Sequence, residues 1–197
     1  MATETLRPNG NDTTGLYNNT SNQVNNYSYV DESSANDNDF VHNLTVFDGY
    51  ATDLYAFPAT AIPAGSTINK ITFYARFKHG EGSDYCKFAY KSGGTTYYSS
   101  APNITTSYAE YSWEQTTNQK TSAAFTIDDI NALVAGPSLY YTKSAAGGFC
   151  SQFWLVIEYT ASGWSNIAKY NGVDSADIAK INGVAVADIA KINGVAI

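Results

Sequence analysis

The fold is decided by the stretch Ile68-Asn-Lys-Ile-Thr-Phe-Tyr-Ala-Arg-Phe-Lys78. From its fourth residue onward, small or apolar side chains alternate with polar or amphipathic ones. A period of two is that of a β-strand with one face in a hydrophobic core, because successive side chains point to opposite faces of a sheet. We therefore expect a strand whose core-facing residues are Ile71, Phe73, Ala75 and Phe77.

Residues 1–160 contain further short segments of this kind, separated by turns rich in Gly, Pro, Asn and Ser. The segments are Glu4–Pro8, Tyr27–Val30, Phe40–Phe47, Asp53–Phe57, Tyr85–Lys91, Thr96–Ser99, Ala109–Glu114, Leu139–Thr142 and Phe149–Thr160. Asn9–Asn26 has no apolar periodicity and is expected to be a long loop. Many short strands with long connections are typical of an antiparallel β-sandwich. We predict an all-β domain over residues 1–160, a jelly-roll β-sandwich; a β-barrel suits the long connections less well.

One segment of this domain has the signals of a helix. Thr126 is placed to cap its N-terminus, and Asp128 and Asp129 fall in the first turn, where the helix dipole favours negative charge. Gly136-Pro137 is expected to end it. We therefore predict one short helix over residues 127–134, which covers one end of the sandwich.

Residues 161–197 form a separate tail built from a repeated unit. Asp177-Ile-Ala-Lys-Ile-Asn-Gly-Val184 recurs without change as Asp188-Ile-Ala-Lys-Ile-Asn-Gly-Val195, eleven residues later, and residues 165–173 are a variant of the same unit. Internal repeats indicate copies of one small structural unit that cannot bury its apolar face alone. The tail must therefore dock on the preceding domain or on other chains.

The repeat allows two local structures. Asn-Gly between two short apolar runs is a strong signal for a β-hairpin with a two-residue turn. Alternatively, Ser165, Asp174 or Ser175 caps a single helical turn, which Asn-Gly ends in the left-handed conformation. We expect the second structure, a tail of short helical turns, because Ala is a poor strand former and Ser or Asp repeatedly precedes the unit.

The tail carries more aliphatic surface than three small units can bury. A large aliphatic side chain gains about 2 kcal/mol on burial. We predict an interface for docking or oligomerisation formed by Trp164, Ile167, Ile178, Ile181, Val184, Ile189, Ile192 and Val195. The expected partners are other copies of the chain, as a homo-oligomer, or other proteins of the same assembly.

The composition excludes several classes of partner. The formal net charge is −7 and the pI is about 4.6, whereas binding to a nucleic-acid backbone or an anionic membrane needs a basic surface. No run approaches the roughly 20 apolar residues that span a bilayer, so no membrane insertion is expected. The N-terminus has neither the basic nor the apolar region of a secretory signal, which predicts a protein made in a cytoplasm and not exported.

The sequence offers no motif for catalysis. The two histidines, His42 and His79, have no second His or Cys at zinc-ligand spacing, and there is no nucleophile elbow, P-loop or dinucleotide fingerprint. We therefore predict that the protein is not an enzyme and holds no metal or cofactor. The acidic stretch with Asp31, Glu32, Asp37 and Asp39 is a candidate calcium site, but we favour a solvated acidic loop.

The two cysteines, Cys86 and Cys150, both fall in strand-like runs. A disulfide between them is one alternative. We favour two buried thiols that pack as small apolar side chains.

Several motifs together resemble a known family. They are Glu4–Pro8, Tyr29–Glu32, the strand with Trp113, the helix motif Thr126–Gly136 and the final strand Cys150–Tyr159. Over most of residues 1–160 the chain is similar to a jelly-roll domain of tailed-phage virion proteins and of some bacterial surface proteins. It departs from that pattern at residues 123–125, where such domains often carry Pro-Trp. The C-terminal repeats look like extensions of phage structural proteins.

This resemblance implies a non-enzymatic structural protein of a bacteriophage virion that assembles through its repeats. Capsid decoration, head-fibre and tail proteins are the roles it suggests, with other virion proteins as partners. Neither motif carries a catalytic residue, so the resemblance implies none in this chain.

The alternative function is a carbohydrate-binding, lectin-like module of a virion or a cell surface. Jelly rolls are common scaffolds for lectins, and surface glycans pack on exposed aromatic rings. The candidate glycan contacts are Tyr97, Tyr98, Tyr140 and Tyr141, with Tyr108, Tyr111 and Trp113 as further candidates. The same rings could instead cover a face of the sandwich or a subunit contact.

Overall fold

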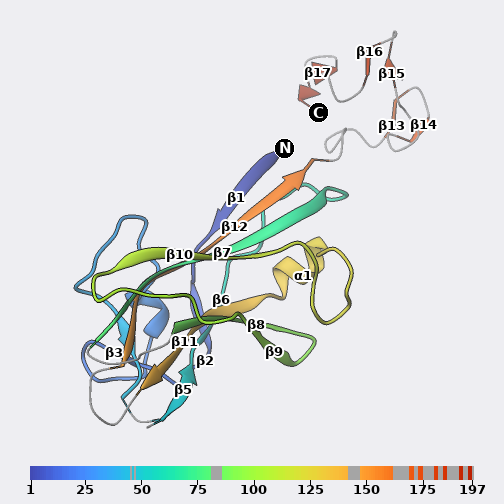
Figure 1. The fold of residues 1–197 in the computed structure, drawn as a ribbon. Coiled ribbons are helices and arrows are strands. Elements are labelled where there is room, and N and C mark those ends of the chain that lie inside the picture. Colours follow the sequence, from blue (N-terminus) through green and yellow to red (C-terminus); the bar gives the residue numbers. More distant parts are fainter. Residues whose placement is uncertain are drawn as a thin grey trace.

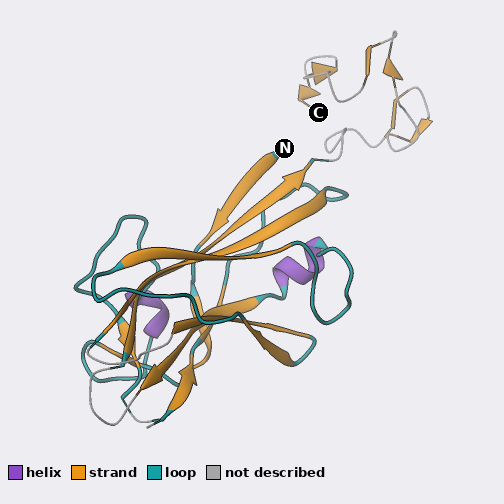
Figure 2. Cartoon of the chain, in the orientation of Figure 1, coloured by secondary structure: helices purple, strands orange, loops and turns teal. Residues whose placement is uncertain are grey.

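The computed structural model describes residues 1–44, 46, 48–80, 86–141 and 147–161, and the backbone of six short strands in the tail. Before the tail, the described strands form two antiparallel sheets that lie one above the other, as Figure 1 shows. Helix contributes little, as Figure 2 shows by colour. The predicted all-β sandwich is confirmed.

The first sheet, sheet A, contains the longest strands. Their order is β1 (Ala2–Leu6), β12 (Gly148–Thr160), β7 (Thr67–His79) and β10 (Ala109–Gln115), and β4 (Val41–His42) and β3 (Tyr17–Asn18) extend the sheet beside the start of β12. Sheet B has the order β9 (Thr95–Tyr98), β8 (Cys86–Ser92), β11 (Val134–Tyr141), β6 (Leu54–Ala56) and β2 (Gly10–Thr13), and β5 (Gly49–Thr52) also pairs with β11.

The connections identify the sandwich as a jelly roll. From β7 onward the chain passes from sheet A to sheet B, makes the hairpin β8–β9, and then crosses between the sheets at each step through β10, β11 and β12. The four-strand orders β1-β12-β7-β10 and β6-β11-β8-β9 result from this path. Sheets of interleaved, non-consecutive antiparallel strands are the product of the paired Greek keys of a jelly roll.

The core confirms the alternation predicted for β7. Ile71, Phe73, Ala75 and Phe77 are all fully buried. They meet aromatic side chains from sheet B: the rings of Phe77 and Phe88 are 5.2 Å apart, and those of Phe73 and Tyr90 are 5.4 Å apart. Stacked and tilted rings across the two sheets fill the space between them with large apolar groups.

The predicted long loop Asn9–Asn26 contains two short strands, β2 and β3. The residues after it, predicted to be extended, form a short 3-10 helix, η1 (Asn26–Tyr29). Both expectations were wrong because this part of the chain is held by buried polar contacts, which leave no apolar periodicity in the sequence.

Asp53 is the centre of those contacts. Its fully buried carboxylate accepts hydrogen bonds at Oδ1 from the backbone N–H groups of Gly15 (2.7 Å) and Leu16 (2.8 Å). At Oδ2 it accepts from the Asn26 amide (2.8 Å) and the Tyr55 hydroxyl (3.1 Å). Burial raises the pKa of Asp53, and these four donors oppose that rise. The segment between β2 and η1 is thus tied to Asp53, the residue between β5 and β6.

The predicted helix is shorter than expected. α1 spans only Ile127–Asn131, begins with the expected Thr126 cap, and is reinforced by Asp129, whose carboxylate accepts from the Thr126 backbone N–H at 2.8 Å. Strand β11 already starts at Val134, so Gly136-Pro137 lies within a strand and does not end the helix. Gly136 is needed there because a Cβ would collide with the carbonyl oxygen of Asp53, whose N–H in turn bonds the carbonyl of Pro137 at 3.1 Å.

The tail contains three β-hairpins. β13 (Lys169–Tyr170) pairs with β14 (Val173–Asp174), β15 (Lys180–Ile181) with β16 (Val184–Ala185), and β17 (Lys191–Ile192) with β18 (Val195–Ala196). The expectation of helical turns is therefore wrong at these residues. In each unit the paired strands lie on either side of an Asn-Gly dipeptide, a sequence that favours hairpin pairing strongly enough to outweigh the low strand propensity of Ala. The proposed capping residues Ser165 and Ser175 lie outside the described residues, whereas Asp174 is a strand residue.

Candidate assembly site

The tail hairpins repeat one geometry. In the second and third hairpins, Ile181 faces Val184 and Ile192 faces Val195, while Lys180 and Lys191 face alanines. In the first hairpin, Tyr170 faces Val173 and Lys169 faces Asp174. Each strand has only two residues, and an isolated two-stranded hairpin is at best marginally stable in water. Such hairpins need further contacts to persist.

The structure places half of the predicted interface residues. Ile181 pairs with Val184, and Ile192 pairs with Val195, across the strands of the second and third hairpins. Trp164, Ile167, Ile178 and Ile189 lie outside the described residues. The pairing of Lys169 with Asp174 was not predicted from the sequence, because these residues pair only in a hairpin and helical turns were expected.

The sandwich does not offer a comparable apolar surface. Among its described residues, the exposed large apolar side chains are Met1, Val24, Val46 and Tyr98, and they come from separate segments. Isolated apolar residues on a surface are ordinary, whereas association surfaces gather them into a patch. The described part of the sandwich thus has a complete core and little apolar surface left for assembly.

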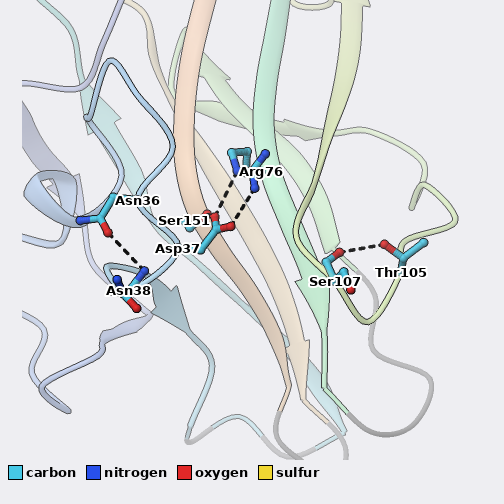
Figure 3. Close-up of polar contacts among 7 residues, drawn as sticks. All are labelled: Asn36, Asp37, Asn38, Arg76, Thr105, Ser107 and Ser151. Carbon is cyan, nitrogen blue, oxygen red and sulfur yellow. Dashed lines mark hydrogen bonds and ion pairs between the residues drawn. The ribbon is translucent and has the colours of Figure 1, made fainter.

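The outer face of sheet A carries the acidic stretch. The Asp37 carboxylate accepts from Nε (3.1 Å) and Nη2 (2.8 Å) of Arg76 on β7, and from the Ser151 hydroxyl on β12 at 2.8 Å (Figure 3). The Arg76 hydrogen bond is the main reason why the pKa of Asp37 is lowered. Asp37 therefore fastens the acidic stretch to the sheet. The sequence signal for this contact was Arg76 itself, which lies on the polar side of the alternation in β7.

A second set of contacts also holds the acidic stretch on sheet A. The side-chain amide of Gln152 donates to the backbone carbonyl of Glu32 at 2.8 Å, and Arg7 donates to the same carbonyl. The Arg7 guanidinium also lies 5.5 Å from the centre of the Trp154 ring, which stacks on Tyr74 at 5.2 Å. Arg7 follows β1 and Tyr74 lies on β7, the two strands that flank β12. Trp154 is therefore approached from both sides and belongs to a structural stack.

Glu32 is the most strongly perturbed carboxyl of the acidic stretch. Burial, with smaller contributions from the negative charges of Asp31 and Asp39, raises its pKa to about 7. Its Oε2 is buried and has no hydrogen-bond partner among the described residues. Ionisation of this carboxyl is therefore unfavourable in the folded state, because the group is partly buried and no donor of the described residues reaches Oε2.

No three His, Cys, Asp or Glu side chains in the described parts of the chain are grouped as metal ligands. In the acidic stretch, Asp37 is engaged by Arg76, and Asp39 accepts from the Asn36 amide at 2.6 Å. His42 packs between aromatic rings, 5.5 Å from Phe149, and burial lowers its pKa. These contacts are structural, and they give the calcium alternative no support.

The four candidate glycan contacts occupy two separate places on sheet B. Tyr98 on β9 is half exposed (49%), while Tyr97 stacks on the core residue Tyr90 at 5.4 Å. Tyr140 and Tyr141 lie at the end of β11, where Tyr140 contacts Tyr50. Tyr98 pairs with Ala89 on β8, and Ala89 pairs with Gly136 on β11. Tyr140 is four residues beyond Gly136, so Tyr98 and Tyr140 are about 14 Å apart along the strand direction. The structure does not bring the two pairs into one platform.

The further aromatic candidates also contribute to packing. Tyr111 and Trp113 on β10 pack against the core, with the Trp113 ring 5.2 Å from Phe73. The Lys78 ammonium lies 4.5 Å from the ring centre of Tyr108. Glycan binding by these rings stays a prediction.

The structure confirms the favoured state of the cysteines. Cys86 and Cys150 are buried thiols and are not bridged. Burial raises the pKa of the Cys150 thiol, which keeps it protonated and unreactive.

Fold and tail together define the class of protein: a jelly-roll β-sandwich followed by repeated short β-hairpins. No family model matches the chain, and a search of curated proteins finds no relative. The described part of the structure contains no helix that is long and apolar enough to cross a membrane.

Proposed function

We propose that this chain is a non-enzymatic structural protein that associates with copies of itself through its C-terminal hairpin repeats and presents the jelly-roll sandwich outward. The observation that carries the proposal is the recurrence of one hairpin register at an eleven-residue period, with an Ile–Val pair beside the turn in two of the three units.

The tail hairpins are very small. Strands of two residues make too few contacts to stabilise themselves, and each described tail strand pairs only with the other strand of its own hairpin. Their outer edges therefore present backbone groups on which another strand can pair. Equivalent hairpins of other copies supply both the missing hydrogen-bond partners and an apolar surface, so association and hairpin stability increase together.

The wider role in this proposal is that of a bacteriophage virion component, such as a capsid decoration, head-fibre or tail protein. Its support is the resemblance of the sandwich and of the repeats to phage structural proteins. In such a particle the tail would join the copies, and other virion proteins would be further partners.

The test is the mass in solution of the full chain and of a chain ending at Thr160, by size-exclusion chromatography with light scattering. The shorter chain keeps all the sheet pairings of the sandwich and is expected to be a folded monomer. The full chain is expected to be an oligomer of defined mass. Monomers in both cases would overturn the proposal.

A matched pair of variants locates the contact. Ile181→Asp with Ile192→Asp places charge beside two hairpin turns and is expected to give monomers. Tyr98→Ser alters the most exposed aromatic ring among the four glycan candidates and is expected to leave the oligomer unchanged. Loss of the oligomer with Tyr98→Ser alone would move the interface to the sandwich and contradict the proposal.

A further inference from the structure

The three tail hairpins are not equivalent. The second and third have the same residues at all four strand positions: Lys, Ile, Val and Ala. The first has Tyr170 in place of Ile181 and Ile192, and Asp174 in place of Ala185 and Ala196. Two of its four strand positions therefore differ, and one of them puts opposite charges, Lys169 and Asp174, on facing strands.

Identical units create a problem for an assembly of parallel tails. If one copy is shifted by one unit, its second hairpin meets the third hairpin of its neighbour, which offers the same residues in the same register. The two identical units therefore add affinity without defining the alignment. A shifted copy also leaves one hairpin unpartnered at each end, and such open ends recruit further copies into assemblies without a fixed size.

From these differences we infer that the first hairpin, Lys169–Asp174, sets the register of the assembly by pairing with the first hairpin of a second copy. This inference rests on the proposed function. When the first hairpins of two copies pair, Tyr170 of one copy is next to Tyr170 of the other. Lys169 of each copy is then in the same hairpin pair as Asp174 of the other copy. When the copies are shifted, Tyr170 is level with an isoleucine position, and Lys169 is level with a unit that has alanine where Asp174 stands.

In this arrangement the two identical hairpins contribute affinity, and the first hairpin distinguishes the correct alignment from shifted ones. A single distinctive polar position among repeated apolar ones is an established way to specify alignment, at some cost in stability. Here the distinctive unit is the first of three, next to the sandwich. Copies that align there are aligned along the rest of the tail, and the assembly closes with no unit left over.

The experiment moves the distinctive residues. Variant one, Tyr170→Ile with Asp174→Ala, gives all three hairpins the same strand residues. Variant two adds Ile192→Tyr and Ala196→Asp to variant one, which transfers the distinctive residues to the third hairpin. Light scattering with native mass spectrometry then measures the share of protein outside the main oligomer, and a tagged wild-type chain, co-expressed with each variant, measures mixed assembly.

Variant one is expected to raise the share outside the main oligomer at least tenfold, and to form fewer mixed oligomers with the wild type than the wild type forms with itself, because no hairpin of the variant matches the first hairpin of the wild type. Variant two is expected to restore a single mass, and to form at least tenfold fewer mixed oligomers with the wild type than the wild type forms with itself. If variant one keeps a single mass, the inference about register is overturned while the proposed function stands. If the wild type itself is a monomer, both are overturned. The melting temperature of the sandwich in each variant reports whether the domain is intact.

Discussion

At the scale of single residues, the stability of the sandwich depends on a few buried polar groups. Asp53 holds a connection of low apolar content through four donors, and Glu32 places a half-buried carboxyl where one oxygen has no hydrogen-bond partner in the described part of the chain. The first group stabilises the fold and the second opposes it. Substitutions at the two positions should therefore act in opposite directions.

Replacing Asp53 by Asn is expected to destabilise the protein by about 2–3 kcal/mol. In the variant, one carboxylate oxygen is replaced by an NH2 group, which cannot accept a hydrogen bond. At least one of the four buried donors therefore loses its acceptor. Urea denaturation measures the change, and hydrogen exchange should locate faster opening at Gly15 and Leu16. Asp12→Asn, at a partly exposed ion pair with Lys91, is the control and should change stability by no more than about 0.5 kcal/mol. Equal effects of the two substitutions would contradict the role of the Asp53 contacts.

Replacing Glu32 by Gln is expected to stabilise the protein at pH 8 and to matter much less at pH 5. The pKa of Glu32 is about 7 in the folded chain and 4.5 as the ordinary value, so the folded state binds the proton more tightly. The contribution of Glu32 to folding stability therefore falls as pH rises from about 4.5 to 7. Because the group is partly exposed, we expect a gain of only about 1 kcal/mol at pH 8.

The measurement for Glu32 is urea denaturation of wild type and variant across pH 5–8. Glu110→Gln, at an exposed residue of β10, is a matched control that should leave the pH dependence unchanged. A Glu32→Gln gain of the same size at every pH would show that ionisation is not its cause.

At the scale of secondary-structure elements, the sequence best predicted the strands that bury one face in the core. The alternation in β7 predicted its core residues correctly, because one face of that strand is fully buried and the other is mostly only partly buried. It failed where tertiary contacts overrule local signals. Gly136-Pro137 reads as a helix end, yet it continues a strand because the backbone of Asp53 approaches there.

The tail shows how two valid local signals compete. Ser and Asp before Ile-Ala-Lys-Ile are typical of a capped helical turn, and Asn-Gly is typical of a hairpin. The hairpin forms, and with it a cross-strand opposition of Lys169 and Asp174 that a helical model does not contain. Of the candidate assembly site, the aliphatic residues were predictable from composition and period, but their pairing was not.

Lys180 and Lys191 allow a direct test of the tail structure. Both occupy strand positions facing alanine, and Thr favours strands where Gln favours helices. In the proposed oligomer, the double variant to Thr should therefore resist dissociation by urea more than the double variant to Gln, by a free energy of about 0.5–1 kcal/mol for the pair. The comparison is matched, because both variants remove the same two charges. The opposite order would indicate helical turns.

At the scale of the whole molecule, the sandwich has one hydrophobic core that contains both thiols, so their reactivity reports whether the core opens. Cys86 lies on sheet B and Cys150 on sheet A, and both are fully buried. We expect neither thiol to react with an aromatic disulfide reagent in the native protein over the time in which two thiols react in denaturant. Cys86→Ala, which should release one equivalent, is the control. Rapid labelling of the native protein would show that the sheets separate locally.

The junction between sandwich and tail has a mechanical consequence. The chain enters the tail from the end of β12, a strand hydrogen-bonded to β7 along its length and to β1 beside its last residues, where Ala2 is level with Tyr159 (Figure 1). A pull on the tail therefore acts along the axis of an interior strand. Its backbone hydrogen bonds lie across that direction and resist together in shear, instead of opening one by one as when an edge strand is peeled away. If the tail joins the copies of an assembly, as proposed, a sandwich attached in this way would withstand traction transmitted through the tail.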